Sequence, residues 1–203
     1  MKAFVLFSGG KDSSLSAILT EPFFESVELV TICFSILDVG AIAKSVAKKI
    51  GFAHTVLNLD EKILRNALEI IINTGHPENA INYIHQNAIE VLACKLSFEN
   101  TNGMIVDGIR RDDRVPKITY STIKSIEARH NICHTSPLKG YGRKAVDDLV
   151  NQHFIIEENE SNILKKADYE TELRELIRIE YGAEKIQEIF SAHTQSRVIK
   201  RIR

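Results

Sequence analysis

A seven-residue segment near the start of the chain, Ser-Gly-Gly-Lys-Asp-Ser-Ser at residues 8–14, has the residue types needed to hold an anion. The adjacent glycines Gly9 and Gly10 allow positive φ and a close backbone approach, so successive N–H groups can point into one concavity. A helix that begins near Asp12 would direct the positive end of its dipole at the same point. The segment therefore predicts a phosphate-binding loop between a strand and a helix.

The side chains of this segment fit the same chemistry. Lys11 adds a positive charge, and three hydroxyls can donate to phosphate oxygens, those of Ser8, Ser13 and Ser14. A Walker A loop is excluded because Val5 stands where its first glycine is required, and the dinucleotide pattern GxGxxG lacks its three glycines. The alternative is a tight turn without a ligand, which needs neither the lysine nor the aspartate.

The same segment, placed directly after a predicted first strand, resembles the SGGxDS signature of the PP-loop ATP pyrophosphatases, also called adenine nucleotide alpha hydrolases. In that family the loop grips the β and γ phosphates of ATP and leaves the α phosphorus open to attack. The resemblance implies AMP and pyrophosphate as products. It assigns pyrophosphate binding to Ser8, Gly9, Gly10, Ser13 and Ser14, a catalytic charge to Lys11, and coordination of Mg²⁺ to Asp12.

A second charged segment, residues 107–114, follows the predicted fourth strand and resembles the family segment in which a glycine lies by the nucleotide and an acidic residue follows. Its arginines can neutralise charge that develops on the phosphates, and its carboxylates can bind Mg²⁺. The alternative is a solvated loop whose ion pairs contribute about 0–1 kcal/mol each. The candidates are Gly108 beside the nucleotide, Arg110 or Arg111 on the phosphates, with Arg111 as the catalytic one, and Asp113 or Asp112 on Mg²⁺.

Two further segments complete the predicted site. Phe34, at the end of the second predicted strand, is expected to contact adenine, with core packing as the alternative. Residues 136–144 resemble a late element of the family, in which Lys139, Arg143 or a catalytic Lys144 reaches the phosphates. The glutamate usual in the following helix is absent. Cations at a helix start are unfavourable against the dipole, so a bound anion would compensate them.

Apolar, β-rich runs alternate with runs of helical period, which predicts an α/β fold. We expect an open, parallel, five-stranded sheet with helices on both faces, of the HUP or Rossmann-like kind, and a ligand outside the carboxyl ends of the strands. The expected strands are residues 3–7, 27–34, 54–59, 104–107 and 132–135, and the expected helices are 12–19, 39–50, 60–74, 77–98, a helix ending near 130 and one beginning near 143.

Residues 1–150 are expected to form the PP-loop ATP-binding domain, and residues 151–203 a small, charged, helical C-terminal extension. Within the extension, residues 168–179 have an amphipathic period, whose apolar stripe would pack on the core or on a partner, including a second copy in a homodimer. That stripe consists of Leu173, Leu176 and Ile177. The polar and cationic ending at 193–203 has no assigned mechanism, and a frayed tail is its alternative.

The composition is that of a globular protein, with 203 residues, 44% hydrophobic and 26% charged. No run of about 18 apolar residues predicts a membrane span, and the apolar start is too short for a signal sequence, so a cytoplasmic location is expected. The three cysteines, Cys33, Cys94 and Cys133, include no CxxC pair, which argues against a disulfide framework or a zinc site. Cys94 and Cys133 are expected to fill the core.

The resemblance leaves the acceptor open. No cysteine follows Cys133, so the C-terminal catalytic cysteine of the adenylylsulfate reductases is absent. The net charge of −1 gives no argument for nucleic acid, but basic clusters at 110–117 and 197–203 favour a tRNA base as the group that is adenylated. The alternatives are a small carboxylate or amide, an amide-forming ligase that uses ammonia or an amine, a module that binds ATP or AMP without chemistry, and an assembly subunit.

Overall fold

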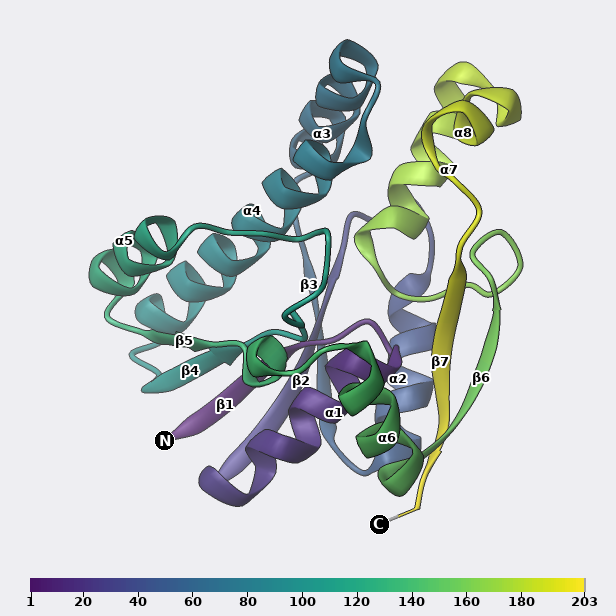
Figure 1. Cartoon of the computed structure of the whole chain (residues 1–203). Helices are drawn as coiled ribbons and strands as arrows, with labels where there is room; N and C mark the ends of the chain where they lie inside the picture. The colour runs from purple at the N-terminus through teal and green to yellow at the C-terminus, as the bar shows by residue number, and fades with distance from the viewer. Residues whose placement is uncertain (203) are drawn as a thin grey trace.

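The computed structural model describes residues 1–202 and has a parallel five-stranded sheet as its middle layer (Figure 1). The strands run in the order β3-β2-β1-β4-β5, which confirms the expected α/β class. This is the order of a doubly wound sheet, in which the chain starts in the middle and builds outward in both directions. The strands are β1 Lys2–Leu6, β2 Ser26–Cys33, β3 Ala53–Asn58, β4 Gly103–Val106 and β5 Cys133–Thr135.

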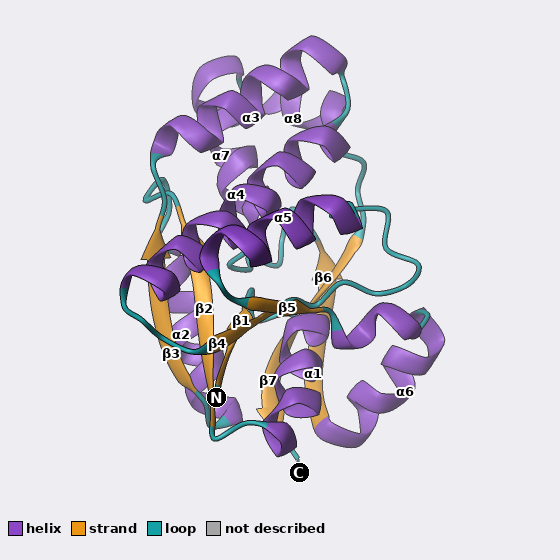
Figure 2. Ribbon diagram, turned by 90° about the vertical axis from the view of Figure 1, so that its left-hand side faces the viewer, coloured by secondary structure: helices purple, strands orange, loops and turns teal. Residues whose placement is uncertain are grey.

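Helices cover both faces of the sheet and enclose two separate apolar cores (Figure 2). One core lies under α3, α4 and α5, and the other lies under α1, α2 and α6. None of the described helices has the length and apolar composition of a membrane span. The helices are α1 Lys11–Thr20, α2 Val39–Ile50, α3 Glu61–Thr74, α4 Pro77–Phe98, α5 Tyr120–His130 and α6 Arg143–His153, with short 3₁₀ turns η1 Glu21–Phe23 and η2 Pro137–Gly140.

Local sequence sets most helix ends. Asp60 caps α3 by accepting the N–H of Lys62 at 2.9 Å, and Gly75 ends it at φ 73°. Asp38 caps α2 in the same way, through the N–H of Ala41 at 3.2 Å. Helix α1 is different, because it begins after Gly10 and no side chain caps it.

The two central strands place the predicted functional loops next to each other. β1 pairs with β4 in register, with Val5 opposite Val106. The chain leaves β1 toward α1 on one face and leaves β4 toward α5 on the other. The carboxyl ends of β1 and β4 therefore form the topological switch point, where ligands bind in sheets of this kind.

The C-terminal segment differs from the expected helical extension. Besides α7 Tyr169–Tyr181 and α8 Ala183–Ile189, it contains β6 Phe154–Glu160 and β7 Thr194–Arg201, which pair as an antiparallel ribbon beside α2 (Figure 1). An ion pair between the two strands helps the glutamate-rich sequence of β6 to form a strand. In this pair Arg197 of β7 binds Glu157 of β6 at 2.5 Å. The ending at 193–203 is therefore a strand from Thr194 to Arg201 and not a frayed tail there. Residue 150 lies inside α6, so the extension continues directly from that helix.

Helix α7 packs on the main body through the predicted stripe, because Leu173, Leu176 and Ile177 are all buried in the core under α3 and α4. Core packing, and not a partner chain, therefore accounts for them. Beside them Glu172 is 1% exposed, and its carboxylate accepts three backbone N–H groups at the end of β2. The donors and distances are Phe34 at 3.0 Å, Ile36 at 3.1 Å and Leu37 at 3.4 Å.

Replacement of this carboxylate tests how α7 is held. Glu172→Ala leaves buried N–H groups without an acceptor, and we expect the free energy of unfolding to fall by about 2–4 kcal/mol. Urea unfolding followed by circular dichroism measures the change. Glu175→Ala on the same helix is the control, because it breaks only an outward-facing pair with Arg178 and should cost under about 1 kcal/mol. Equal losses in the two variants would contradict the role given to Glu172.

Candidate functional site

A cavity of about 280 Å³ opens at the carboxyl ends of β1, β2 and β4. Its polar wall comes from three segments far apart in the chain: the loop after β1, the loop after β4, and residues 166–170 before and at the start of α7. Its apolar wall comes mainly from β1, β2, α4 and the loop before α5. Five of the site residues predicted from the sequence line this cavity, namely Ser8, Asp12, Ser13, Gly108 and Asp113.

The loop after β1 presents unused backbone donors. Gly9 has φ 78°, and the N–H groups of Gly9, Lys11, Asp12 and Ser13 have no acceptor within residues 1–202. The loop's own serines accept two other N–H groups at long distances, from Ser8 at 3.3 Å and from Gly10 at 3.4 Å. Free N–H groups at the start of an uncapped helix favour an anion.

The loop is held in this orientation from both sides. Two of its carbonyls are occupied by the C-terminal segment, since Ala167 N–H donates to Ser8 O at 3.1 Å and Val198 N–H donates to Gly9 O at 3.0 Å. On the other side Gly108 packs against the start of α1, where a Cβ on Gly108 would lie 3.0 Å from the Ser13 nitrogen. A glycine is therefore required for the loop after β4 to approach the N–H groups of α1 this closely.

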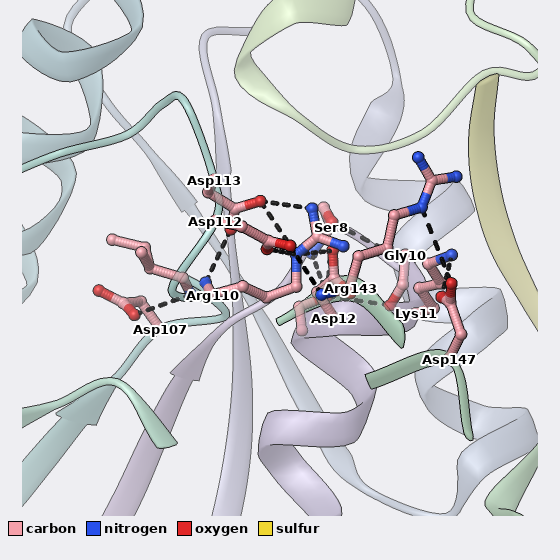
Figure 3. A network of polar contacts seen from close by, with 12 residues as sticks. Ser8, Gly10, Lys11, Asp12, Asp107, Arg110, Asp112, Asp113, Arg143 and Asp147 are labelled. Carbon is pink, nitrogen blue, oxygen red and sulfur yellow. Dashed lines mark hydrogen bonds and ion pairs between the residues drawn. The ribbon is translucent and has the colours of Figure 1, made fainter. Parts of the chain in front are cut away.

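The two predicted magnesium ligands differ in availability (Figure 3). Asp12 Oδ1 is buried without a partner, and Oδ2 lies 3.8 Å from Arg110 Nε. Burial raises the pKa of the Asp12 carboxyl, although the charge of Arg110 opposes this. Asp113 has both oxygens committed to Arg110, one to the side chain at 2.5 Å and one to the backbone N–H at 2.7 Å. Asp12 is therefore the carboxylate with a free oxygen.

Lys11 does not line the cavity, contrary to the role expected for it. Its Nζ points to α6 and β6, 2.7 Å from Asp147 and 3.4 Å from Glu158 (Figure 3). Lys166 lies in the cavity wall instead and pairs with Asp168 at 3.0 Å. Burial disfavours the charged form of Lys166, but Asp168 and other nearby carboxylates outweigh it and raise the pKa of the ammonium. The positive charge in the cavity wall thus comes from Lys166, in a segment where no sequence motif predicts a functional role.

Two other predicted ligand contacts are placed elsewhere. The Phe34 side chain is 3% exposed in the core, and its N–H donates to Glu172, so the structure does not present it to a nucleotide in the cavity. The cavity's apolar wall includes Val30 and Ile32 of the same strand. Ser14 is fully buried and outside the lining, because its position on α1 faces the sheet.

The cations predicted after β5 are also away from this cavity. Arg143 and Lys144 are exposed at the start of α6 and line neither this cavity nor the neighbouring one. The anion at that helix start is the protein's own, since Asp112 accepts the N–H of Arg143 at 2.7 Å. Arg111 and Lys139 line the neighbouring cavity.

A buried polar network that sequence spacing did not reveal lies beside the loop after β4. Asp107 is 1% exposed, and its Oδ2 lies 3.0 Å from His134 Nε2 and 3.4 Å from His85 Nε2. His85 Nδ1 contacts the Tyr169 hydroxyl at 3.2 Å. Burial alone would raise the pKa of Asp107, but the hydrogen bonds with the two histidines outweigh it and hold that pKa well below its usual range. An ionised Asp107 requires both Nε2 atoms to donate.

The cysteines do not form a catalytic group here. Cys94 and Cys133 are exposed, which corrects the expectation that they fill the core, and neither lines the cavity. Burial raises the pKa of the Cys33 thiol to about 12, so it stays protonated. Within residues 1–202 no three His, Cys, Asp or Glu side chains are grouped to hold a metal by themselves.

The ionised state of Asp107 gives a pH-dependent test. Asp107→Asn removes the negative charge and replaces one of the two accepting oxygens with an NH2 donor, and we expect a loss of about 1–3 kcal/mol in the free energy of unfolding at pH 7. Because the folded-state pKa lies below that of the unfolded chain, this contribution is present above about pH 4 and is lost as the pH falls further. The free energies of unfolding of the original protein and Asp107→Asn, measured with urea, should therefore become more similar below about pH 4. A difference that stays constant to pH 3 would contradict an ionised Asp107.

Comparison with known proteins gives relatives that cover the whole chain. An uncharacterized protein of Methanocaldococcus jannaschii is 42% identical over 199 residues, which is 98% of this chain and 96% of the relative. A crystal structure from the same organism, described as a predicted subunit of tRNA methyltransferase, is 39% identical and covers 100% of this chain and 98% of that one, with a TM-score of 0.88. The model of a family of unknown function, DUF7411, matches residues 1–200. The chain belongs to the DUF7411 family.

Proposed function

We propose that this chain binds ATP at the loop after β1 and cleaves it between the α and β phosphates, transferring AMP to an acceptor. The observation that carries the proposal is the set of N–H groups without an acceptor in residues 1–202, at Gly9, Lys11, Asp12 and Ser13, in a loop whose residues Ser8, Asp12 and Ser13 line a cavity at the switch point of the sheet. The resemblance of residues 8–14 to the PP-loop signature supports the same reaction. Pyrophosphate lies in the N–H cup, and the α phosphorus faces outward.

The charges of the cavity support the magnesium complex of ATP over the bare nucleotide. Five carboxylates line the cavity, those of Asp12, Asp107, Asp113, Asp168 and Glu170, against one lysine, Lys166. A polyphosphate alone would be repelled. Mg²⁺ is commonly held by one or two carboxylates together with substrate phosphates, so the free Oδ1 of Asp12 fits it without a larger cluster. When bound, Mg²⁺ would offset the negative charge of the phosphates.

The remaining groups bind and orient the nucleotide. Ser8 and Ser13 offer hydroxyls at the cup, and Lys166, which lies beside Gly10, offers a charged donor from the neighbouring wall. Adenine packs against the apolar wall, where Val30 and Ile32 replace the expected Phe34. Residues 166–170 form the wall of the cavity on the side of the C-terminal segment.

We propose a tRNA base as the acceptor. The description of the M. jannaschii crystal structure supports a tRNA substrate, and the reaction itself is inferred from the loop. An amide-forming ligase would release the same AMP with ammonia or an amine in place of RNA. A module without chemistry would bind ATP and release nothing.

The products of the reaction test the proposal. The purified protein, incubated with Mg²⁺, ATP labelled at the α phosphate and unmodified tRNA transcript, should place the label on tRNA as bound AMP. Water that displaces this AMP from the tRNA should release it as free labelled AMP, which thin-layer chromatography separates, and a coupled pyrophosphatase assay measures the unlabelled pyrophosphate. Asp12→Asn keeps the volume of the side chain and removes its charge, and we expect a rate on the order of 100-fold lower. Unfolding curves confirm that the variant is folded. Formation of ADP and phosphate would refute cleavage between the α and β phosphates.

The two lysines near the loop make a second test. Lys166→Met removes the charged donor in the cavity wall, and we expect the Kd for ATP with Mg²⁺, measured by calorimetry, to rise by about 10–100-fold. Lys165→Met, at the exposed neighbouring position, is the matched control and should leave the Kd unchanged. Lys11→Met should have the smaller effect of the two, because Asp147 and Glu158 hold Lys11 away from the cavity. A larger rise in the Kd for Lys11→Met than for Lys166→Met would assign the phosphate contact to Lys11.

A further inference from the structure

A second cavity, of about 610 Å³, adjoins the first one. The two share a wall formed by Asp107, Ile109, Asp113 and Pro116. The other walls of the second cavity come from residues 117–127, which lead into and form most of α5, and from residues 134–139 at the end of β5 and in η2. A molecule in this space would lie directly beside a nucleotide bound in the first cavity.

The carboxylates of the second cavity are all committed to partners. Asp113 binds Arg110 at 2.5 Å, Glu127 binds Lys124 at 2.7 Å, and Asp107 is held by the two histidines. The lining contains three further cations, and in the described part of the chain none of them has a carboxylate partner. These are Arg111, Lys117 and Lys139. The cavity therefore has an excess of positive charge, in a chain whose net charge is −1.

The three unpaired cations come from separate places around the opening. Arg111 belongs to the loop after β4, Lys117 precedes α5, and Lys139 lies in η2. A single small carboxylate binds one or two such groups, whereas successive phosphates along a chain can contact all three. The arrangement favours a polyanion.

An aromatic ring lines the same cavity as these cations. Tyr120, the first residue of α5, lines the cavity and is 73% exposed, and Lys124 Nζ lies 5.6 Å from the centre of its ring. An exposed tyrosine that lines the same cavity as cations without a carboxylate partner is the combination that binds single-stranded nucleic acid, with bases on rings and phosphates on cations.

We infer that the second cavity binds a single-stranded segment of RNA, with its phosphates on Arg111, Lys117 and Lys139 and a base against Tyr120. This deepens the proposed function and rests on it for the reaction, because the shared wall at Asp107 and Asp113 sets the segment beside the nucleotide. His134, whose ring is fixed by Asp107, lies at the floor of the cavity and positions the base that enters.

Charge reversal tests the inference. The probe is a fluorescein-labelled, unmodified tRNA transcript, and the readout is fluorescence anisotropy between 50 and 200 mM salt. Lys117→Glu and Lys139→Glu should each weaken binding about 10-fold or more, and the slope of log K against log salt should fall by about 1 for each phosphate interaction removed. Tyr120→Ala should weaken binding about 10-fold with no change in slope. Lys49→Glu, exposed at the far end of α2, changes the net charge equally and should have no effect.

The outcomes separate this inference from the proposed function. ATP binding to the same variants is measured without RNA and should match the original protein. The inference would be overturned if Lys117→Glu and Lys139→Glu bound tRNA as tightly as the original protein does. It would also be overturned if the original protein bound ATP but no tRNA. Calorimetry with citrate and glutamate tests a small carboxylate, and binding of these without tRNA would also overturn it. Cation-dependent tRNA binding without ATP binding would support the inference and refute the proposed function.

Discussion

The approach of the loop after β4 to the start of α1 is the constraint on which the site depends. The two strands are neighbours, so their loops must share the space above one sheet edge. Only a residue without a side chain fits at Gly108, since a Cβ would be 3.0 Å from the Ser13 nitrogen and 3.2 Å from the Asp12 carbonyl carbon. A larger residue would displace the N–H groups that form the cup, and it would do so without changing either apolar core.

The C-terminal segment takes part in the site as well as in the core. Its ribbon and the turn before α7 occupy the carbonyls of Ser8 and Gly9, and so hold the loop whose N–H groups at Gly9, Lys11, Asp12 and Ser13 have no acceptor in residues 1–202. Glu172 fixes the neighbouring end of β2 by accepting three N–H groups. Residues 166–170 then form one wall of the cavity. A chain that ended at residue 150 would lack these interactions.

Features with a local cause were predictable from the sequence. The bounds of α2 are those expected, because Asp38 and Gly51 define both ends, and the placement of the loops after β1 and β4 follows from the alternation of strands and helices. Features made by distant segments were not. The ribbon of β6 and β7 depends on pairing across the intervening helices, so the glutamates of β6 resembled a solvated helix.

The same limit explains the charges of the site. Lys11 belongs to the loop motif, yet two carboxylates from α6 and β6 draw its side chain outward, and no local pattern encodes those partners. Lys166 enters from a segment with no motif. Likewise His85 and His134 meet only because α4 and β5 both flank β4, where Asp107 ends the strand.

Asp107 also separates two spaces of opposite charge. The first cavity is rich in carboxylates, whereas the second contains three cations with no carboxylate partner in residues 1–202. A bare carboxylate in the shared wall would repel phosphates on both sides. The two histidines share that charge by hydrogen bonding to it, so the wall can lie between two anionic ligands at close range. In the proposed function, this buried network between the cavities would reduce the repulsion between an anionic ligand in one cavity and an anionic ligand in the other.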